Sequence, residues 1–285
     1  MSRGKFVPTT LKTALTEHWP EYLIEAWALG TFMISAGLAA TLLGFPGSPL
    51  HRLIPDPMLR NVLGGAAMGL TAIALIHSPW GKRSGAHMNP AVTLTFLRLG
   101  KTRGWDAIFF IAAQSIGGLL GVLVVAAALG SAFTAAPVSY AATMPGPAGP
   151  RIAFIAELTI SGALMFVILA LSASARLARF TGVAAGTLVA LYISFESPLS
   201  GMSMNPARTF ASAAPGMLWE NFWIYLTAPV LGMLGGAQLF LAVRGAQRLA
   251  CAKLLHPADA RCIHCGHQPA RFATRAGGVQ GVPEN

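Results

Sequence analysis

Charged residues are scarce in this sequence: Asp, Glu, Lys and Arg together make up 11% of its 285 residues. Soluble domains normally carry about 25% charged residues, so this scarcity argues against an ordinary soluble enzyme or binding domain. Hydrophobic residues reach 54%, which indicates an integral membrane protein. The length of 285 residues leaves room for roughly six spans, because about 20 residues are needed to cross a hydrocarbon core of about 30 Å.

Cysteine is also rare. All three cysteines, Cys251, Cys262 and Cys265, lie near the C-terminus, so we expect no disulfide framework in the apolar part of the chain. The first twenty residues lack a continuous apolar core followed by a small-residue cleavage site. We therefore expect the first span, and not a secretory signal, to direct membrane insertion.

Apolar runs occupy most of the chain and predict an all-α membrane protein with six transmembrane helices. The runs lie at about 21–43, 58–77, 105–130, 151–173, 180–195 and 221–243. No Ser/His/Asp set or His-Glu metal site lies at membrane depth, so we do not expect an enzyme.

The formal net charge of +10 raises the question of a nucleic-acid partner. The basic residues lie between the apolar runs and form no single patch, so we expect no nucleic-acid binding. If the N-terminus is cytoplasmic, the outside segments hold only Arg52, Arg60, Arg151 and Arg208 of the twenty Lys and Arg residues. The positive-inside rule therefore predicts a plasma (inner) membrane protein with both termini in the cytoplasm, in contact with anionic lipid.

The chain contains an internal repeat. Residues 85–93 match residues 201–209 at six of nine positions, with Asn-Pro-Ala in both. Two further sets recur at equal intervals: Glu25, Gly30 and Met33 with Glu157, Gly162 and Met165, and Trp105 and Gly117-Gly118 with Trp223 and Gly235-Gly236. Three spans per half is an odd number, so the second half enters from the opposite side as an inverted repeat. We expect the glycine pairs to form helix contacts, with lipid-facing glycine as the alternative.

Each Asn-Pro-Ala segment predicts a helix start, because asparagine is a favoured N-cap and proline suits the first helical position. The apolar stretches after Asn89-Pro90-Ala91 and Asn205-Pro206-Ala207 are too short to span and are predicted to be re-entrant half-helices that meet at mid-membrane. Their positive dipole ends would repel cations. If Asn89 and Asn205 turn their amide groups into a shared path, both donate to one passing oxygen and interrupt a proton wire.

Three further residues stand out at membrane depth. Arg208 follows the second Asn-Pro-Ala and costs about 2.5 to 3.5 kcal/mol at this depth, so we expect it at a watery constriction, with snorkelling to the outer surface as the alternative. Glu25 and Glu157 are the only acids well inside the apolar runs. We expect them to accept hydrogen bonds from the non-helical backbone before each Asn-Pro-Ala, with a proton relay as the alternative.

At these motifs, over about residues 20–243, the sequence resembles the aquaporin, or major intrinsic protein, family. The resemblance implies six tilted helices plus two half-helices, one pore per subunit, a homotetramer, passive conduction of water or small uncharged solutes, and no cofactor. It divides the chain into an N-terminal segment (1–20), a channel domain (21–243, repeats about 21–130 and 151–243) and a basic Cys/His-containing tail (244–285).

The family narrows its pore at four positions, and Arg208 matches the arginine among them. Counting back along the chain, Met202 and Ile193 match two others, and the fourth falls on Met68 or Gly69. Strict water channels of the family usually carry histidine where Ile193 stands, and glycerol channels usually carry glycine with aromatics nearby. The resemblance therefore leaves the solute open.

Several solutes and mechanisms stay open at this point. Thr209 and Ala213 favour the water-channel pattern, because glycerol facilitators typically have aspartate after the arginine. An Ile and Met lining predicts modest water flow with small neutral solutes as further cargo. A glycerol facilitator is the alternative, and a secondary transporter, which also uses inverted repeats, is disfavoured by the lack of an ion-coupling acidic cluster.

The tail contains soft metal ligands. Cys251, Cys262, Cys265 and His267 are candidates for a tetrahedral zinc site, and His256 lies nearby. Only one C-x-x-C is present, and the second ligand pair has no standard spacing. We therefore interpret the tail as a flexible basic segment without a metal.

Overall fold

The computed structural model describes residues 10–245, 249, 251–256 and 261–267, and this part of the chain is helical without any β-strand. Six helices are long and apolar enough to cross a membrane, which confirms the predicted spans to within a few residues. They are α2 (Trp19–Gly44), α4 (Pro57–His77), α7 (Gly104–Leu129), α9 (Pro150–Ser172), α10 (Thr181–Phe195) together with the 3-10 turn η2 (Ala178–Phe180) that precedes it, and α13 (Phe222–Arg244). Residues 1–9 and 268–285 of the expected terminal segments lie outside the described residues.

Shorter helices connect or enter the bundle. The two half-helices are α6 (Pro90–Arg98) and α12 (Pro206–Ala213). The remaining elements are α1 (Leu11–Glu17), α3 (Pro49–Leu53), α5 (Pro79–Ser84), α8 (Ser131–Thr134), α11 (Ser197–Ser200) and the 3-10 turns η1 (Ser139–Ala141) and η2 (Ala178–Phe180).

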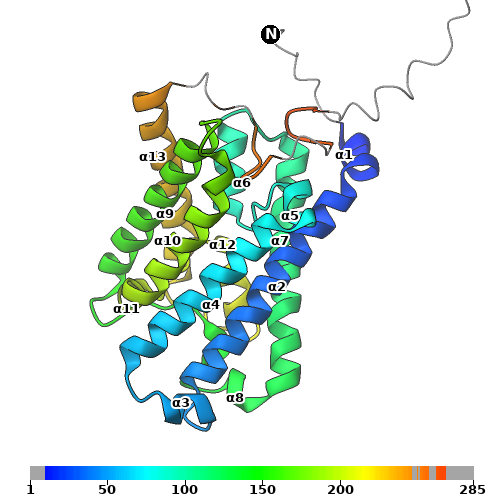
Figure 1. The fold of residues 1–285 in the computed structure, drawn as a ribbon. Coiled ribbons are helices and arrows are strands. Elements are labelled where there is room, and N and C mark those ends of the chain that lie inside the picture. Colours follow the sequence, from blue (N-terminus) through cyan, green and yellow to red (C-terminus); the bar gives the residue numbers. More distant parts are fainter. Residues whose placement is uncertain (1–9, 246–248, 250, 257–260, 268–285) are drawn as a thin grey trace, which may run out of the picture.

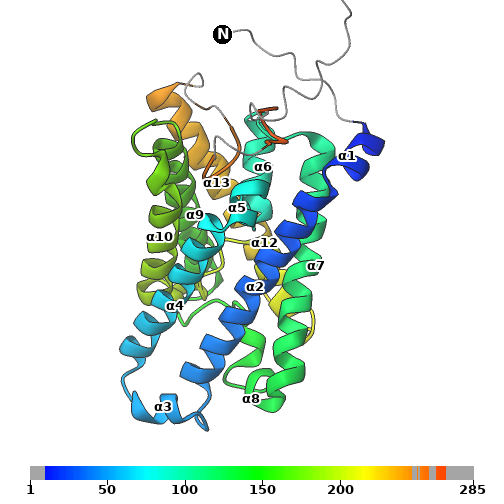
Figure 2. The same cartoon turned by 45° about the vertical axis from the view of Figure 1, so that its right-hand side comes forward.

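The spans pair within each half and join across the halves. Helix α2 packs along α7 in the first half, α9 packs along α13 in the second, and α4 packs against α10 between them. We call the end of the bundle that carries α1 and the described tail residues the tail face, and the end that carries α3 and α8 the opposite face (Figure 1). Helix α6 lies on the tail-face side of the bundle and α12 on the other side of its centre, as the turned view also shows (Figure 2).

Glycines bring the paired spans into backbone contact. A Cβ atom on Gly121 of α7 would lie 2.3 Å from the carbonyl oxygen of Gly30 in α2. A Cβ atom on Gly236 of α13 would lie 2.2 Å from the carbonyl oxygen of Gly162 in α9. Small residues of this kind allow membrane helices to approach closely, and here the same contact occurs once in each half.

The glycine repeat differs in register from the one predicted. Gly117 faces the backbone of α2 as Gly232 faces that of α9, so Gly117 and Gly121 correspond to Gly232 and Gly236. Matching Gly117-Gly118 to Gly235-Gly236 is therefore wrong by three residues, and Gly235 has no atom within 4 Å of an added Cβ. Positions three residues apart share one helix face, so the sequence match alone could not detect this shift.

Candidate functional site: a central pore

The two Asn-Pro-Ala segments meet inside the bundle, where each asparagine caps its own half-helix. The Oδ1 atom of Asn89 accepts a hydrogen bond from the backbone N–H of Ala91 at 2.8 Å. The Oδ1 atom of Asn205 accepts from Ala207 at 3.1 Å and from Arg208 at 3.2 Å. Capping through oxygen fixes the orientation of both side chains and leaves both amide nitrogens free for other acceptors.

Each amide nitrogen then donates across the junction between the halves. Asn89 Nδ2 donates to the carbonyl oxygen of Met204 at 2.7 Å, and Asn205 Nδ2 donates to that of Met88 at 2.7 Å. A side-chain amide carries two N–H donors, so each asparagine keeps one N–H beyond this bond. Both side chains line the central cavity, where that second donor can meet a solute.

The loops before the asparagines have a backbone conformation that L-residues rarely adopt. The φ angles are +54° at Ala86 and +49° at Met88, and the matching residues Met202 and Met204 have +48° and +53°. Such turns break the helical hydrogen-bond pattern and leave backbone N–H groups that need acceptors when they are buried.

A buried carboxylate from the first span of the first half supplies acceptors to its loop. Glu25 accepts hydrogen bonds from the backbone N–H of His87 at 3.1 Å and of Met88 at 2.6 Å. Two side chains also donate to it, Ser84 through Oγ at 2.7 Å and Gln114 through Nε2 at 2.9 Å. The donors that this carboxylate meets among the described residues thus come from the loop, from the end of α5 and from the neighbouring span α7.

Glu157 has the equivalent surroundings in the second half. It accepts from the backbone N–H of Ser203 and Met204 at 2.6 and 2.7 Å, and from the hydroxyl of Ser200 at 2.8 Å. Sequence reasoning missed the serines. The signal was present, because Ser84 and Ser200 stand in matching places directly before the aligned repeat.

Two cavities adjoin along the bundle, and we call the residues that line both of them the constriction. The central cavity has a volume of about 110 Å³ and contains both asparagines, and a second cavity of about 560 Å³ lies towards the opposite face. Five residues line both cavities: Ala36, Met68, Ile193, Met202 and Arg208. Four of them are the positions that the family resemblance indicated for the filter.

The structure favours Met68 over Gly69 at the second-span position. A Cβ atom on Gly69 would lie 2.6 Å from the carbonyl oxygen of Gly186, so Gly69 packs α4 against α10 and faces away from the cavities. Arg208 is the polar member of the constriction, and its buried Nη1 atom has no hydrogen-bond partner within the described residues. Among the five residues that line both cavities, Arg208 is the one whose side chain can donate hydrogen bonds.

The chain as a whole matches known membrane proteins. The sequence profile of the major intrinsic protein family matches residues 14–240. This chain belongs to the major intrinsic protein family. It is therefore a channel for water and small uncharged solutes.

Individual relatives agree with this assignment. Aquaporin NIP2-3 of Zea mays is 33% identical over 228 residues, which cover 79% of this chain and 73% of that protein. Aquaporin NIP2-2 of Zea mays is 32% identical over 246 residues, which cover 85% and 79%. The X-ray structure of the aquaglyceroporin from Plasmodium falciparum shares the fold, with a TM-score of 0.63, 22% identity, and coverage of 79% of this channel and 96% of that chain.

The described tail residues of this channel pack against its tail face. Leu254 is only 4% exposed and lines the central cavity together with His87. Its backbone N–H donates to the carbonyl oxygen of Gly85 at 3.2 Å, and the Nε2–H group of His87 donates to the carbonyl oxygen of Ala252 at 2.9 Å. The flexible-tail interpretation is therefore wrong for this stretch, because burial and hydrogen bonds to a loop far away in the sequence hold it in place.

The tail cysteines converge with a different histidine from the one expected. Ligand atoms of Cys251, His256, Cys262 and Cys265 all lie within 4.8 Å of one another. His267 is not in this group, and its ring lies beside that of His256 with centroids 5.5 Å apart. The sequence spacing could not distinguish the two histidines, because both stand within a few residues of the cysteines.

Proposed function

We propose that this channel passes water and small uncharged solutes in single file while it excludes ions and protons. The crossed pair Asn89 and Asn205 carries the proposal. A water oxygen that accepts the remaining N–H of both asparagines cannot also accept from its neighbours in the file, because its acceptor capacity is used. A hydrogen-bonded wire through this point is thereby interrupted.

Ion exclusion has two physical supports. The N-termini of α6 and α12 each contribute about half a positive elementary charge beside the central cavity, and Arg208 adds a full charge at the constriction. Cations are repelled by both. The cavity wall offers few polar groups to replace an ion's hydration shell, and this raises the cost of entry for ions of either sign.

The residues that line the constriction indicate which solutes pass. Met68, Ile193 and Met202 present apolar, adaptable surface, and Arg208 is the member of the set that donates hydrogen bonds from its side chain. A passing water molecule finds few hydrogen-bond partners here. A solute with a small apolar part gives up fewer hydrogen bonds when it enters this lining. We therefore expect modest water flow together with passage of small neutral solutes. The alternative is a glycerol facilitator, in which water flow is the minor activity.

We further propose that the tail face is cytoplasmic, that the protein lies in the plasma (inner) membrane, and that it assembles as a homotetramer. The distribution of Lys and Arg supports the orientation, since the segments on the other side contain only Arg52, Arg60, Arg151 and Arg208. The family resemblance supports the tetramer, in which every subunit has its own pore.

Flux measurements in proteoliposomes test the proposal. We expect faster osmotic shrinkage than in protein-free liposomes, faster entry of glycerol or urea, and no added proton leak across a pH gradient. An uncoupler should change none of the solute rates. Solute uptake that collapses with the uncoupler would instead indicate a secondary transporter, and glycerol entry without any gain in water flow would favour the glycerol facilitator.

A further inference from the structure

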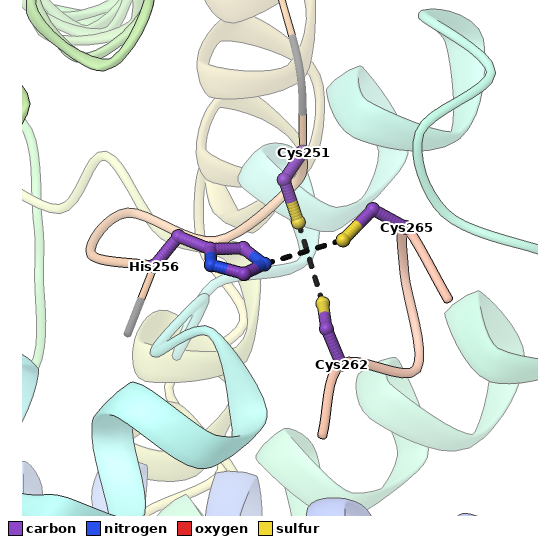
Figure 3. A group of neighbouring side chains, drawn as sticks. All are labelled: Cys251, His256, Cys262 and Cys265. Carbon is purple, nitrogen blue, oxygen red and sulfur yellow. Dashed lines mark hydrogen bonds between the residues drawn. The ribbon is translucent and has the colours of Figure 1, made fainter. Parts of the chain in front are cut away.

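Four side chains of the tail form a compact cluster of soft metal ligands. Cys251 Sγ lies 3.4 Å from Cys262 Sγ, and His256 Nε2 lies 3.2 Å from Cys265 Sγ. Figure 3 shows the four side chains pointing towards one another, with Cys262 and Cys265 on one turn of the tail. All four ligand atoms lie within 4.8 Å of one another, and the three cysteines are free.

This arrangement fits a tetrahedral ion. Zn–S and Zn–N bonds of about 2.3 and 2.0 Å in a tetrahedron would separate two sulfur atoms by about 3.8 Å and a sulfur from a nitrogen by about 3.5 Å. The two short separations in the cluster, 3.4 and 3.2 Å, need to widen by a few tenths of an ångström to match. A set of three cysteines and one histidine selects zinc over calcium or magnesium, because those cations require oxygen ligands.

We propose that Cys251, His256, Cys262 and Cys265 bind one Zn²⁺ ion, and that this ion fastens the tail over the tail-face mouth of the pore. The first part concerns the chemistry of the cluster alone. The second part rests on the proposed function, because it assigns the docked tail a role in controlling flow.

The segment between the first two ligands docks on the pore loop. Ala252 accepts the hydrogen bond from His87, and Leu254 pairs its backbone N–H with Gly85. Lys253 is buried between them, with Nζ donating to the carbonyl oxygen of Lys82 at 3.0 Å and to that of Arg261 at 3.3 Å. Leu254 thereby extends into the central cavity that contains Asn89 and Asn205.

The segment between the last two ligands docks on the other wall. Ile263 is buried in a cluster with Tyr22 of α2 and Phe110 of α7. His264 is buried as well. Its Nε2 donates to the carbonyl oxygen of Ser84 at 3.0 Å. A metal ion between the two segments would therefore connect the pore loop to helices α2 and α7.

A metal cross-link is a physical reason for this tail to be ordered. The described tail residues form no helix or strand, so regular hydrogen bonding does not offset the entropy lost on ordering them. Metal binding closes the loops between ligands and contributes its binding free energy to the docked state. Removing the ion should release Leu254 from the cavity and widen the path on the tail-face side.

Metal content tests the site directly. Full-length protein purified with zinc present should contain one equivalent of zinc per chain by elemental analysis, and Co²⁺ substitution should give the visible absorption of a tetrahedral thiolate site. Cys262→Ser and Cys265→Ser should each lose the metal, whereas His267→Ala should keep it as the matched control. Absence of metal, or loss of two free thiols to a disulfide in its place, would overturn the site.

Flow measurements then test the coupling to the pore. In proteoliposomes a membrane-permeant zinc chelator should raise water permeability several-fold in the wild-type channel and leave Cys262→Ser, which should already be open, unchanged. Leu254→Ala should raise permeability while its zinc content stays at one equivalent. Bound zinc whose removal leaves the flow unchanged would overturn the fastening role. If zinc binds but no variant conducts under any condition, the proposed channel function fails and the metal site stands.

Discussion

Arg208 combines a full positive charge, burial of Nη1 and a place at the constriction between two cavities. We propose that its guanidinium narrows the opening and repels cations, so Arg208→Val should widen the constriction and remove this charge. Glycerol permeability and proton leak should each rise several-fold in proteoliposomes, while water permeability is retained.

The control for this change removes a charge elsewhere. Arg151 is exposed at the start of α9 and lines neither cavity, so Arg151→Val should leave all three rates as in the parent channel. Equal glycerol and proton rates in Arg208→Val and the parent would show that this arginine does not set the selectivity.

Glu157 is a second residue whose chemistry can be changed with little change in shape. Its carboxylate accepts from two consecutive backbone N–H groups, those of Ser203 and Met204. In Glu157→Gln one acceptor oxygen is replaced by an NH2 group that faces a donor, and losing a hydrogen bond to a charged group costs about 1.5 to 3 kcal/mol.

We therefore expect the apparent melting temperature of Glu157→Gln to fall by about 3 to 10 °C, with a matching loss of flow as the pore loop loses its support. Thermal unfolding of purified protein, followed by intrinsic fluorescence, measures this. Glu220→Gln changes an exposed acid and should leave the melting temperature unaltered. A Glu157→Gln channel as stable and conductive as the parent would contradict the supporting role.

At the level of helices, the sequence predicts the elements well because their signals are local. Six apolar runs define the spans, and the Asn-Pro pairs define where α6 and α12 begin, since capping involves neighbouring residues. The contacts between helices are harder to predict from the sequence. Gly236 and Gly235 look alike in the sequence, and only the crossing of α13 with α9 distinguishes the buried glycine from the open one.

That difference can be measured with a matched pair of variants. Gly236→Ala places a Cβ atom 2.2 Å from the carbonyl oxygen of Gly162, so α13 and α9 must separate, at a cost of about 1 to 3 kcal/mol or more. Gly235→Ala meets no atom within 4 Å and should stabilise α13 by up to about 1 kcal/mol through helix propensity. Thermal unfolding of the two variants should shift in opposite directions, and equal shifts would refute the register given for α13.

For the molecule as a whole, the channel could be predicted from the sequence, but the docking of the tail could not. The repeat and its motifs define the pore because equivalent residues recur in both halves. The tail has no second copy, and its contacts to Gly85, His87 and Ser84 join residues far apart in the sequence. Long-range pairings of this kind leave no periodicity or spacing in the sequence, so neither the docking of Leu254 nor the choice of His256 could be predicted.

The orientation of the whole molecule gives a final prediction. Arg52 is exposed in α3 on the opposite face, and Arg176 is exposed in the connection between α9 and α10, close to where Ser172 and Ala178 share a cavity with the tail. If the tail face is cytoplasmic, a membrane-impermeant maleimide should label Arg52→Cys in intact cells and should label Arg176→Cys only after permeabilisation. The parent channel, whose three cysteines all lie in the tail, provides the background. The reverse labelling pattern would show that the positive-inside distribution does not set the topology, and would expose the proposed zinc site to the outside.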